Sequence, residues 1–345
     1  MELSTLARDV DAILEEYRGY VDPEIARVLD TQGRVGTLYD MMRYHLGWTD
    51  ERFQPATRSP GKRFRPAMCL LVCEALGGVR DTALPAAAAI ELVHNFSLIH
   101  DDIEDKDEVR RGMPTVWKVW GVDQAINTGD GLHGLANWAA LGLAARGVPP
   151  EKTLAVLRAI DAAILRLCEG QYLDLSNEGG DVTVEEYLNV IRRKTAALIE
   201  AATHTGAILG TDDHGVWARF ARFGQTLGLA FQIRDDVLGV FSPEKLGKEG
   251  AGDILRRKRN LPYLHALANS PRADRLRQIY AHEPTTAEAG EVLETFRACG
   301  SEAFCTDMAA KHEAEAFRIL QGFASGTKAY ARLLKVAQFL VWRER

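Results

Sequence analysis

The segment Leu84–Lys106 reads LPAAAAIELVHNFSLIHDDIEDK, an alanine-rich apolar run that ends in a cluster of acids. Alanine and leucine at this spacing predict a long, largely buried α-helix. At 100° per residue, Asp101, Asp102 and Asp105 share an arc of about 100° on that helix. Clustered like charges near a helix C-terminus are unfavourable, so a compensating partner is expected. Carboxylates of this kind suit Mg²⁺, whereas the alternative is a solvated acidic helix end.

A second segment, Gln225–Phe241, repeats this pattern with the sequence QTLGLAFQIRDDVLGVF. A long apolar helix here would carry Gln232, Asp235 and Asp236 near its C-terminal end. Because a buried ionised carboxylate without a partner costs several kcal/mol, these acids must face water, a cation or a basic side chain. Two such helices could hold a metal cluster between them.

The rest of the 345-residue chain also shows helical spacing, and strand-like alternation is scarce. Thr183 followed by Glu186 forms a capping box that predicts a helix over Val184–Thr205. No linker or repeat divides the chain, so residues 1–345 are expected to form one all-α domain. Segments rich in Gly, Pro, Ser or Asp separate stretches of helical length at Gln54–Gly61, Arg111–Pro114, Arg146–Pro150, Glu178–Asp181, Thr211–Gly215, Ser242–Gly252, Asn269–Arg272 and His282–Thr285.

Composition excludes several classes of protein. The formal net charge is -6, which argues against general affinity for nucleic acid. The acidic N-terminal segment does not resemble a signal peptide, and the apolar stretches are short of the roughly 20 residues that a transmembrane helix needs. Five cysteines without a CxxC pair indicate neither a disulfide framework nor a zinc site, so a cytoplasmic location is expected.

Positive charge is concentrated in short clusters at predicted loops and helix ends. Arg and Lys at such edges can bind phosphate oxygens, and a glycine such as Gly61 allows close backbone approach. Acid-rich helix ends and basic clusters in an apolar helical bundle favour a substrate with a diphosphate head and a hydrocarbon tail. Arg256, Arg257 and Arg259 are expected to be solvated surface charge instead. The clusters are GKRFRP at Gly61–Pro66, Arg110–Arg111, Arg192–Lys194, Lys248 and Arg256–Arg259.

Five motifs, which occur in the order typical of the family, resemble the trans-isoprenyl diphosphate synthases, or polyprenyl synthetases. The resemblance covers about residues 20–340. The resemblance implies an all-α class I isoprenoid synthase fold, a helical bundle around a central cavity, and usually a homodimer. It also implies condensation of isopentenyl diphosphate with an allylic diphosphate, with about three Mg²⁺ ions per site. The motifs are GKRFRP at Gly61–Pro66, VHNFSLIHDDIEDKDEVRRGMPT at Val93–Thr115, KT at Lys194–Thr195, FQIRDD at Phe231–Asp236 and GKEGAGDILRRKRNLP at Gly247–Pro262.

Matched by motif position, the resemblance implies four groups of site residues. The residues central to catalysis would be Asp101, Asp102, Lys194 and Asp235. Mg²⁺ would be bound by Asp101, Asp102 and Asp105 at the allylic diphosphate, and by Asp235 and Asp236 for a further ion. Isopentenyl diphosphate would be bound by Lys62, Arg65, His94 and Arg111, and the allylic diphosphate by Arg110, Lys194, Thr195, Gln232, Lys248 and Lys258. His100 points about 100° away from Asp101 and is assigned to packing.

Two positions depart from the family pattern. Gly239 stands where many members carry a third aspartate, so metal binding there should rest on two carboxylates, with Asp253 as a possible helper. Asn260 stands where a threonine is common.

Product length is expected to depend on the side chain below the first aspartates. Bulky Phe96, about 7.5 Å along the helix axis from Asp101, followed by small Ser97, resembles the geranylgeranyl (C20) type. The alternatives are a farnesyl diphosphate synthase, a class I terpene cyclase that binds a single diphosphate, and a regulatory subunit without turnover of its own. GKRFRP and the Arg110–Arg111 pair favour two diphosphates over the cyclase.

Overall fold

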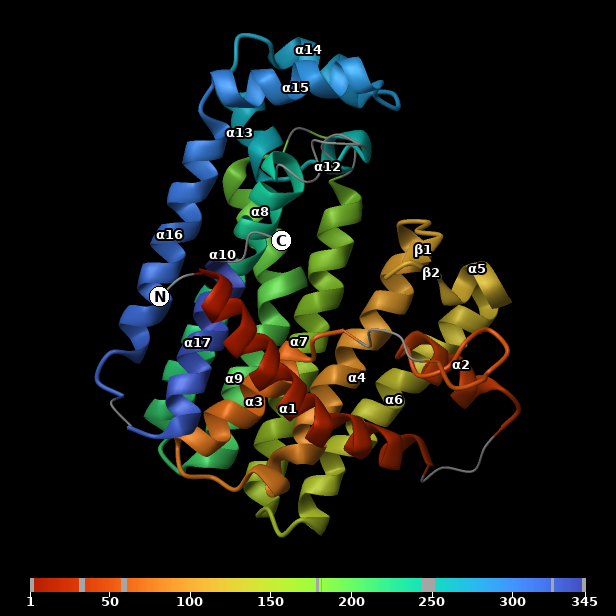
Figure 1. Ribbon diagram of the computed structural model, residues 1–345, viewed down its shortest axis with the longest axis vertical. Coiled ribbons are helices and arrows are strands. Elements are labelled where there is room, and N and C mark those ends of the chain that lie inside the picture. Colours follow the sequence, from red (N-terminus) through yellow and green to blue (C-terminus); the bar gives the residue numbers. More distant parts are fainter. Residues whose placement is uncertain are drawn as a thin grey trace. The chain divides into compact units, whose positions relative to one another are not determined.

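The computed structural model describes residues 3–30, 35–56, 61–177, 180, 182–242, 252–323 and 326–342, and its regular structure is almost wholly helical (Figure 1). The N-terminal half contains α1 (Leu3–Asp30), α2 (Leu38–His45), α3 (Phe64–Ala75), α4 (Arg80–Glu104), β1 (Val109–Arg110), β2 (Met113–Pro114), α5 (Val116–Trp120), α6 (Val122–Ala145) and α7 (Pro150–Ser176). The remainder contains α8 (Val184–Ile191), the π-helical segment η1 (Arg192–Ala196), α9 (Ala197–Gly210), α10 (His214–Phe241), α12 (Gly252–Leu255), α13 (Leu261–Asn269), α14 (Ala273–Tyr280), α15 (Thr286–Ala298), α16 (Ser301–Leu320) and α17 (Lys328–Trp342).

The chain divides into two compact units, which are described separately. The first comprises residues 1–164, 201–218 and 324–336. The second comprises residues 165–200, 219–323 and 337–345. Four of the boundaries fall inside α7, α9, α10 and α17, and the remaining one, after Phe323, lies between α16 and α17. The expectation of one domain over the whole chain stays a prediction.

Helix α4 is the buried centre of the first unit. Its alanines at positions 86–89 are fully buried, and it packs most extensively against α6 and then α3 (Figure 1). Small residues on α6 allow this approach, since a Cβ atom at Gly129 would lie 2.3 Å from Nε2 of His100. The helix is long and apolar enough to cross a membrane, which corrects the sequence-based view that this stretch is too short. However, 72% of its apolar window is buried inside the structure, as in the core helix of a globular protein.

The second unit has its own apolar core, built from α8, α10, α12, α13, α14, α15 and α16. Large buried side chains such as Tyr263, Tyr280 and Phe296 fill it. Asp235 and Asp236 lie near the end of α10, as the sequence predicted. The C-terminal end of α10 and the start of α13 are therefore held by the same core.

The predicted helix over Val184–Thr205 is confirmed at its start and corrected beyond it. Thr183 and Glu186 form the expected capping box. The helix then changes to π geometry over η1 and continues as α9 to Gly210. Glycines let neighbouring backbones approach the π segment closely, because a Cβ atom at Gly170 would lie 2.4 Å from the Lys194 amide nitrogen and one at Gly228 would lie 2.6 Å from Cα of Ala196. Such π segments are frequent at functional sites.

A short β-hairpin with a two-residue turn follows α4. Strands β1 and β2 are antiparallel, with Arg110 paired to Met113. The two turn residues, Arg111 and Gly112, have φ angles of 52° and 75°. Positive φ at both positions matches the twist of the flanking strands, as in a type I′ turn. The hairpin thus places Arg110 on a strand and Arg111 at a tight, strained turn.

Candidate functional site

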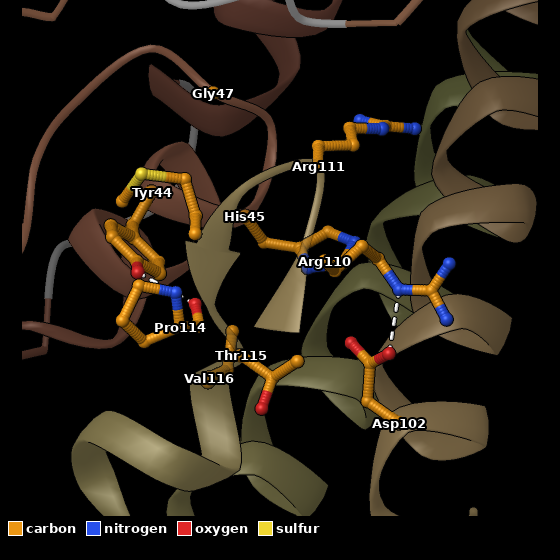
Figure 2. A pocket seen from close by; sticks show the side chains of 10 residues that line it. Tyr44, His45, Gly47, Asp102, Arg110, Arg111, Pro114, Thr115 and Val116 are labelled. Atoms are coloured by element: carbon orange, nitrogen blue, oxygen red, sulfur yellow. Dashed lines mark hydrogen bonds and ion pairs between the residues drawn. The ribbon is translucent and has the colours of Figure 1, made fainter. Parts of the chain in front are cut away.

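The acidic end of α4 is compensated by an arginine from the hairpin. Nε of Arg110 donates a hydrogen bond of 2.6 Å to Oδ1 of Asp102 (Figure 2). Nη2 of Arg110 also lies 3.5 Å from Oδ2 of Asp101. Asp105 caps the helix and is exposed. The compensating partner expected from the sequence is therefore Arg110.

Asp102 is the most buried of these acids, with 1% of its surface exposed. Burial raises the pKa of its carboxyl to about 6, and the Arg110 guanidinium opposes this shift. Its second oxygen, Oδ2, is buried and has no hydrogen-bond partner among the residues that the structure describes. Hard oxygen donors with an unsatisfied carboxylate oxygen fit a divalent cation such as Mg²⁺. Among the described residues, however, no group of three or more acidic, His or Cys side chains is already arranged around a metal position.

The hairpin also forms one wall of a small cavity in the first unit. Figure 2 shows Asp102, Arg110, Arg111 and His45 among the residues that line it. Tyr44 Oη donates a 2.7 Å hydrogen bond to the Pro114 carbonyl oxygen, which fixes the hairpin to α2. Burial, reinforced by the charges of Arg111 and Arg110, holds the pKa of His45 well below its usual value. The cavity therefore presents two arginines beside a neutral imidazole.

Some of the residues predicted to bind isopentenyl diphosphate lie close together in the first unit. Nη1 of Arg65 lies 3.2 Å from Nε2 of His94. Burial, together with Arg65 and Arg111, lowers the pKa of His94, so its ring is neutral near pH 7. A Cβ atom at Gly61 would lie 3.0 Å from Nη2 of Arg111, so the missing side chain gives that guanidinium its space. Lys62 instead forms a 2.9 Å ion pair with Asp11 on α1 and is 58% exposed.

The second acidic helix end lies in the second unit and is organised differently. Asp236 is 4% exposed, and both of its carboxylate oxygens accept hydrogen bonds. Oδ2 accepts from Tyr187 Oη at 2.6 Å and from the Leu261 amide at 3.2 Å, and Oδ1 accepts from Gln232 Nε2 at 3.1 Å. Burial raises the pKa of Asp236 to about 6 against the effect of these donors. Asp235, which is half-buried, is the more accessible carboxylate of the pair.

The KT and FQIRDD motifs meet through a continuous chain of hydrogen bonds. Thr195 Oγ1 donates to Gln232 Oε1 at 2.9 Å, and the same Gln232 donates to Asp236. Lys194 forms a 2.7 Å ion pair with Asp174 on α7. The π segment therefore brings Thr195 against α10 and Lys194 against α7.

Asp253 occupies the space that Gly239 leaves open. A Cβ atom at Gly239 would lie 2.0 Å from Oδ2 of Asp253, so an aspartate side chain at that position and Asp253 as placed here cannot coexist. Asn260 Nδ2 donates a long 3.4 Å hydrogen bond to Asp253, and Lys258 Nζ lies 3.7 Å from its Oδ1. A carboxylate from α12 therefore lies next to Gly239 of α10. Lys248 lies outside the described residues.

The side chain expected to limit product length is braced by α6. Phe96 is 6% exposed, and its ring stacks on His133 at 5.0 Å and meets His100 edge-on at 5.8 Å. His100 therefore packs against Phe96, although its Nε2 also lies 3.6 Å from Asp130. Ser97 Oγ donates to the His94 carbonyl oxygen at 2.8 Å.

Sequence reasoning missed three partly buried groups that lie beside these residues: Tyr187, His45 and His133. Each lies on a helix other than the one that carries its motif partner. A polar or aromatic residue at the buried face of a predicted helix would have been the available signal. Its partner, however, depends on packing between elements distant in sequence.

Comparison with known proteins shows which family the chain resembles. The sequence profile of the family described as Polyprenyl synthetase matches residues 47–296. A geranylgeranyl diphosphate synthase of Mycobacterium tuberculosis is 40% identical over 284 residues, which cover 81% of this chain and 79% of that protein. A (2E,6E)-farnesyl diphosphate synthase of the same organism is 35% identical over 312 residues, covering 88% and 86%.

A solved structure has a similar fold along almost the whole chain. The crystal structure of geranylgeranyl pyrophosphate synthetase from Pyrococcus horikoshii superimposes with a TM-score of 0.88 at 35% identity, covering 98% of this chain and 99% of that one. The predicted helical class I isoprenoid synthase fold is thereby confirmed. On its motifs, its fold and these relatives, the chain belongs to the polyprenyl synthetase family.

Proposed function

We propose that this prenyl diphosphate synthase condenses isopentenyl diphosphate with an allylic diphosphate, head to tail, and that its main product is geranylgeranyl diphosphate. The observation that carries the proposal is the pairing of two kinds of site in one unit. The acidic end of α4 suits a metal-bound diphosphate, and Arg65, His94 and Arg111 form a separate basic cluster. Named relatives that make geranylgeranyl and farnesyl diphosphate support the same reaction class.

Ionisation of the allylic diphosphate leaves negative charge on the departing diphosphate. Mg²⁺, when bound, would neutralise part of that charge and orient the diphosphate. Asp101, Asp102 and Asp105 would hold ions at this diphosphate, and Asp235 and Asp236 a further one, with Asp253 available beside Gly239. Arg110, Lys194 and Lys258 would donate to diphosphate oxygens, because preplaced cations stabilise the charge that develops as the C–O bond breaks.

The acceptor substrate requires a second diphosphate site. Lys62, Arg65, His94 and Arg111 would bind isopentenyl diphosphate, with the neutral His94 ring donating a hydrogen bond rather than adding charge. The alkene of this substrate attacks the allylic cation, a new C–C bond forms, and loss of a proton gives an allylic diphosphate five carbons longer. A terpene cyclase would have no use for this cluster, which favours the synthase over the cyclase.

The product-length assignment rests on Phe96. Its ring is held by His133 and His100, so it cannot easily rotate out of the path of a growing chain. Phe96→Ala should shift the product distribution toward chains longer than C20, measured by chromatography of the dephosphorylated products. His133→Ala removes only the bracing ring and serves as a matched variant with a smaller shift. An unchanged distribution in Phe96→Ala would show that another side chain limits length.

Turnover of the purified chain tests the function directly. With Mg²⁺, labelled isopentenyl diphosphate and an allylic starter of five, ten or fifteen carbons, C20 diphosphate should dominate. Hydrocarbon released from an allylic diphosphate alone would instead identify a cyclase. Absence of turnover until a partner protein is added would identify a regulatory subunit.

We also propose that the chain acts as a cytoplasmic homodimer. Helix α6 exposes Trp138 and Leu141, each with more than half of its surface accessible. Ile126, on the same helix, is also exposed. An apolar helix face of this kind suits contact with a second copy. The cysteines are all free thiols, as a reducing compartment requires. Sedimentation of the purified protein tests the dimer, and Trp138→Glu should shift it toward the monomer.

A further inference from the structure

Arg63 lies in the GKRFRP motif between two proposed ligands of isopentenyl diphosphate, yet it is 3% exposed. Its backbone has φ 49° and ψ 35°, in the left-handed region, and it is the N-cap of α3. Residues other than glycine are uncommon in this conformation and persist there only when the surrounding structure enforces it. The contacts of the Arg63 side chain show what enforces it here.

The Arg63 guanidinium connects the motif to three other parts of the first unit. Nη1 donates to Glu91 Oε1 on α4 at 2.7 Å, and Nε donates to Asp22 Oδ1 on α1 at 3.0 Å. Nη2 donates a longer bond of 3.4 Å to the Leu46 carbonyl oxygen at the end of α2. Burial alone would lower the pKa of Arg63, but Glu91 and Asp22 outweigh it and raise the pKa, so the group stays charged.

The partner carboxylate Glu91 is itself buried and further fixed. It is 3% exposed and accepts a 2.9 Å hydrogen bond from Asn95 Nδ2. Its charge also favours the protonated form of Arg111, whose pKa is lowered by burial and by the nearby Arg63. One buried carboxylate therefore supports Arg63 directly and Arg111 through the electrostatic field.

The conformation of Arg63 controls the directions of its neighbours. Rotation about its φ and ψ angles changes the direction of Gly61 and Lys62 relative to α3, and Arg65 lies in the first turn of that helix. Gly61 in turn provides the space that the Arg111 guanidinium occupies. Three cations that should contact one diphosphate thus depend on a single backbone conformation.

We propose that Arg63 is a positioning residue, whose buried ion pairs with Asp22 and Glu91 hold the turn that orients Lys62, Arg65 and Arg111 for isopentenyl diphosphate. This inference rests on the proposed function, because it takes isopentenyl diphosphate as the ligand. It makes a selective prediction, since the allylic diphosphate is assigned to different side chains. Loss of the anchor should weaken binding of one diphosphate and leave the other nearly unchanged.

The test compares Arg63→Gln with the wild-type chain in steady-state kinetics and in calorimetric binding of isopentenyl diphosphate. Loss of the anchor should raise the KM and the Kd for isopentenyl diphosphate about tenfold, whereas the KM for the allylic diphosphate should change by less than about twofold. Glu91→Gln removes the partner charge and should act in the same direction. In the double variant the two effects should be less than multiplicative, because both substitutions break the same ion pair.

Arg146→Gln is the matched control, because it removes a 2.9 Å ion pair with the buried Glu24, also on α1, without touching the motif. It should lower the midpoint of thermal unfolding without changing either KM. If Arg63→Gln fails to fold, Asp22→Asn weakens the same anchor and should raise only the KM for isopentenyl diphosphate. Equal weakening of both diphosphates, or unchanged binding of isopentenyl diphosphate in folded variants, would overturn the inference. A wild-type chain that forms no prenyl diphosphate would instead refute the proposed function.

Discussion

The two acidic helix ends share a sequence pattern but differ in what compensates their charge. At the end of α4, Asp102 is paired with the cation Arg110, and its other oxygen is buried with no hydrogen-bond partner in the described part of the chain. At the end of α10, Asp236 accepts hydrogen bonds from three neutral donors and has both oxygens occupied. The first arrangement leaves a carboxylate oxygen open toward the cavity, whereas the second holds Asp236 in a fixed orientation and leaves Asp235 as the more accessible carboxylate. The two pairs of aspartates therefore differ in how the buried member is held.

The largest expected difference is in catalysis. Asp102→Asn removes a carboxylate assigned to bind metal and should lower kcat/KM on the order of 10²–10³-fold. Asp236→Asn alters a carboxylate that is also assigned to an ion but is already held by three hydrogen bonds, and should lower it about 10–100-fold. Kinetics at saturating Mg²⁺ measure both values. Equal losses, or a larger loss in Asp236→Asn, would show that the two ends do not differ in this way.

The space around Gly239 offers the next test. Introducing the third aspartate of the family by Gly239→Asp should lower activity and stability, by about 1–3 kcal/mol for the latter, because the new side chain overlaps Asp253. The double variant Gly239→Asp with Asp253→Ser should recover much of both, since it moves the carboxylate from α12 to α10. Thermal unfolding and kcat measure the recovery. A single variant as stable and active as the wild type would refute the idea that Asp253 fills this position.

Added Mg²⁺ should stabilise variants at the ends of α4 and α10 to different extents. Arg110→Gln leaves the buried Asp102 without its cation and should cost about 1–3 kcal/mol, whereas Tyr187→Phe removes one of three donors to Asp236 and should cost about 0.5–1.5 kcal/mol. Added Mg²⁺ should raise the unfolding midpoint of Arg110→Gln more than that of Tyr187→Phe, because a cation that binds the folded state replaces the lost charge. The same Mg²⁺ response in both variants would contradict the comparison.

Some features of these regions could be predicted from the sequence and others could not, for a physical reason. Helix positions, the Thr183 capping box and the acids at both helix ends follow from local periodicity and end chemistry. The hairpin that carries Arg110 and the π segment that carries Lys194 were not predicted, because tertiary contacts select them over continuous helix.

The partners were still less accessible to sequence reasoning. In the sequence Arg63 is one of several cations in a basic motif, and Tyr187 is one aromatic residue on a predicted helix. Their roles depend on Glu91 and Asp236, which lie 28 and 49 positions away in the sequence. A pattern within one element can identify an ionisable side chain, but the group that sets its charge belongs to another element.

The smallest expected effect concerns His94 in the basic cluster. Its pKa is held well below the usual value by burial and by Arg65 and Arg111. Between that lowered pKa and about pH 6.5 the unfolded chain binds a proton that the folded chain does not, so stability should fall as pH decreases below about 6.5. His94→Gln removes this titrating group. The free energy of unfolding should then fall by about 1 kcal/mol less between pH 7.5 and 5.5 than in the wild type. Denaturant unfolding at the two pH values measures it, and identical losses in both proteins would contradict the assignment.

The central claim is that the acids at the end of α4 bind Mg²⁺ and, through it, the diphosphate that departs from an allylic carbon. A crystal structure with Mg²⁺ and a nonhydrolysable allylic diphosphate analogue tests it most directly. The account predicts metal ions bound to Asp101 and Asp102, with Arg110 moved from Asp102 to the diphosphate. A head group bound elsewhere, with Arg110 still paired to Asp102, would contradict it.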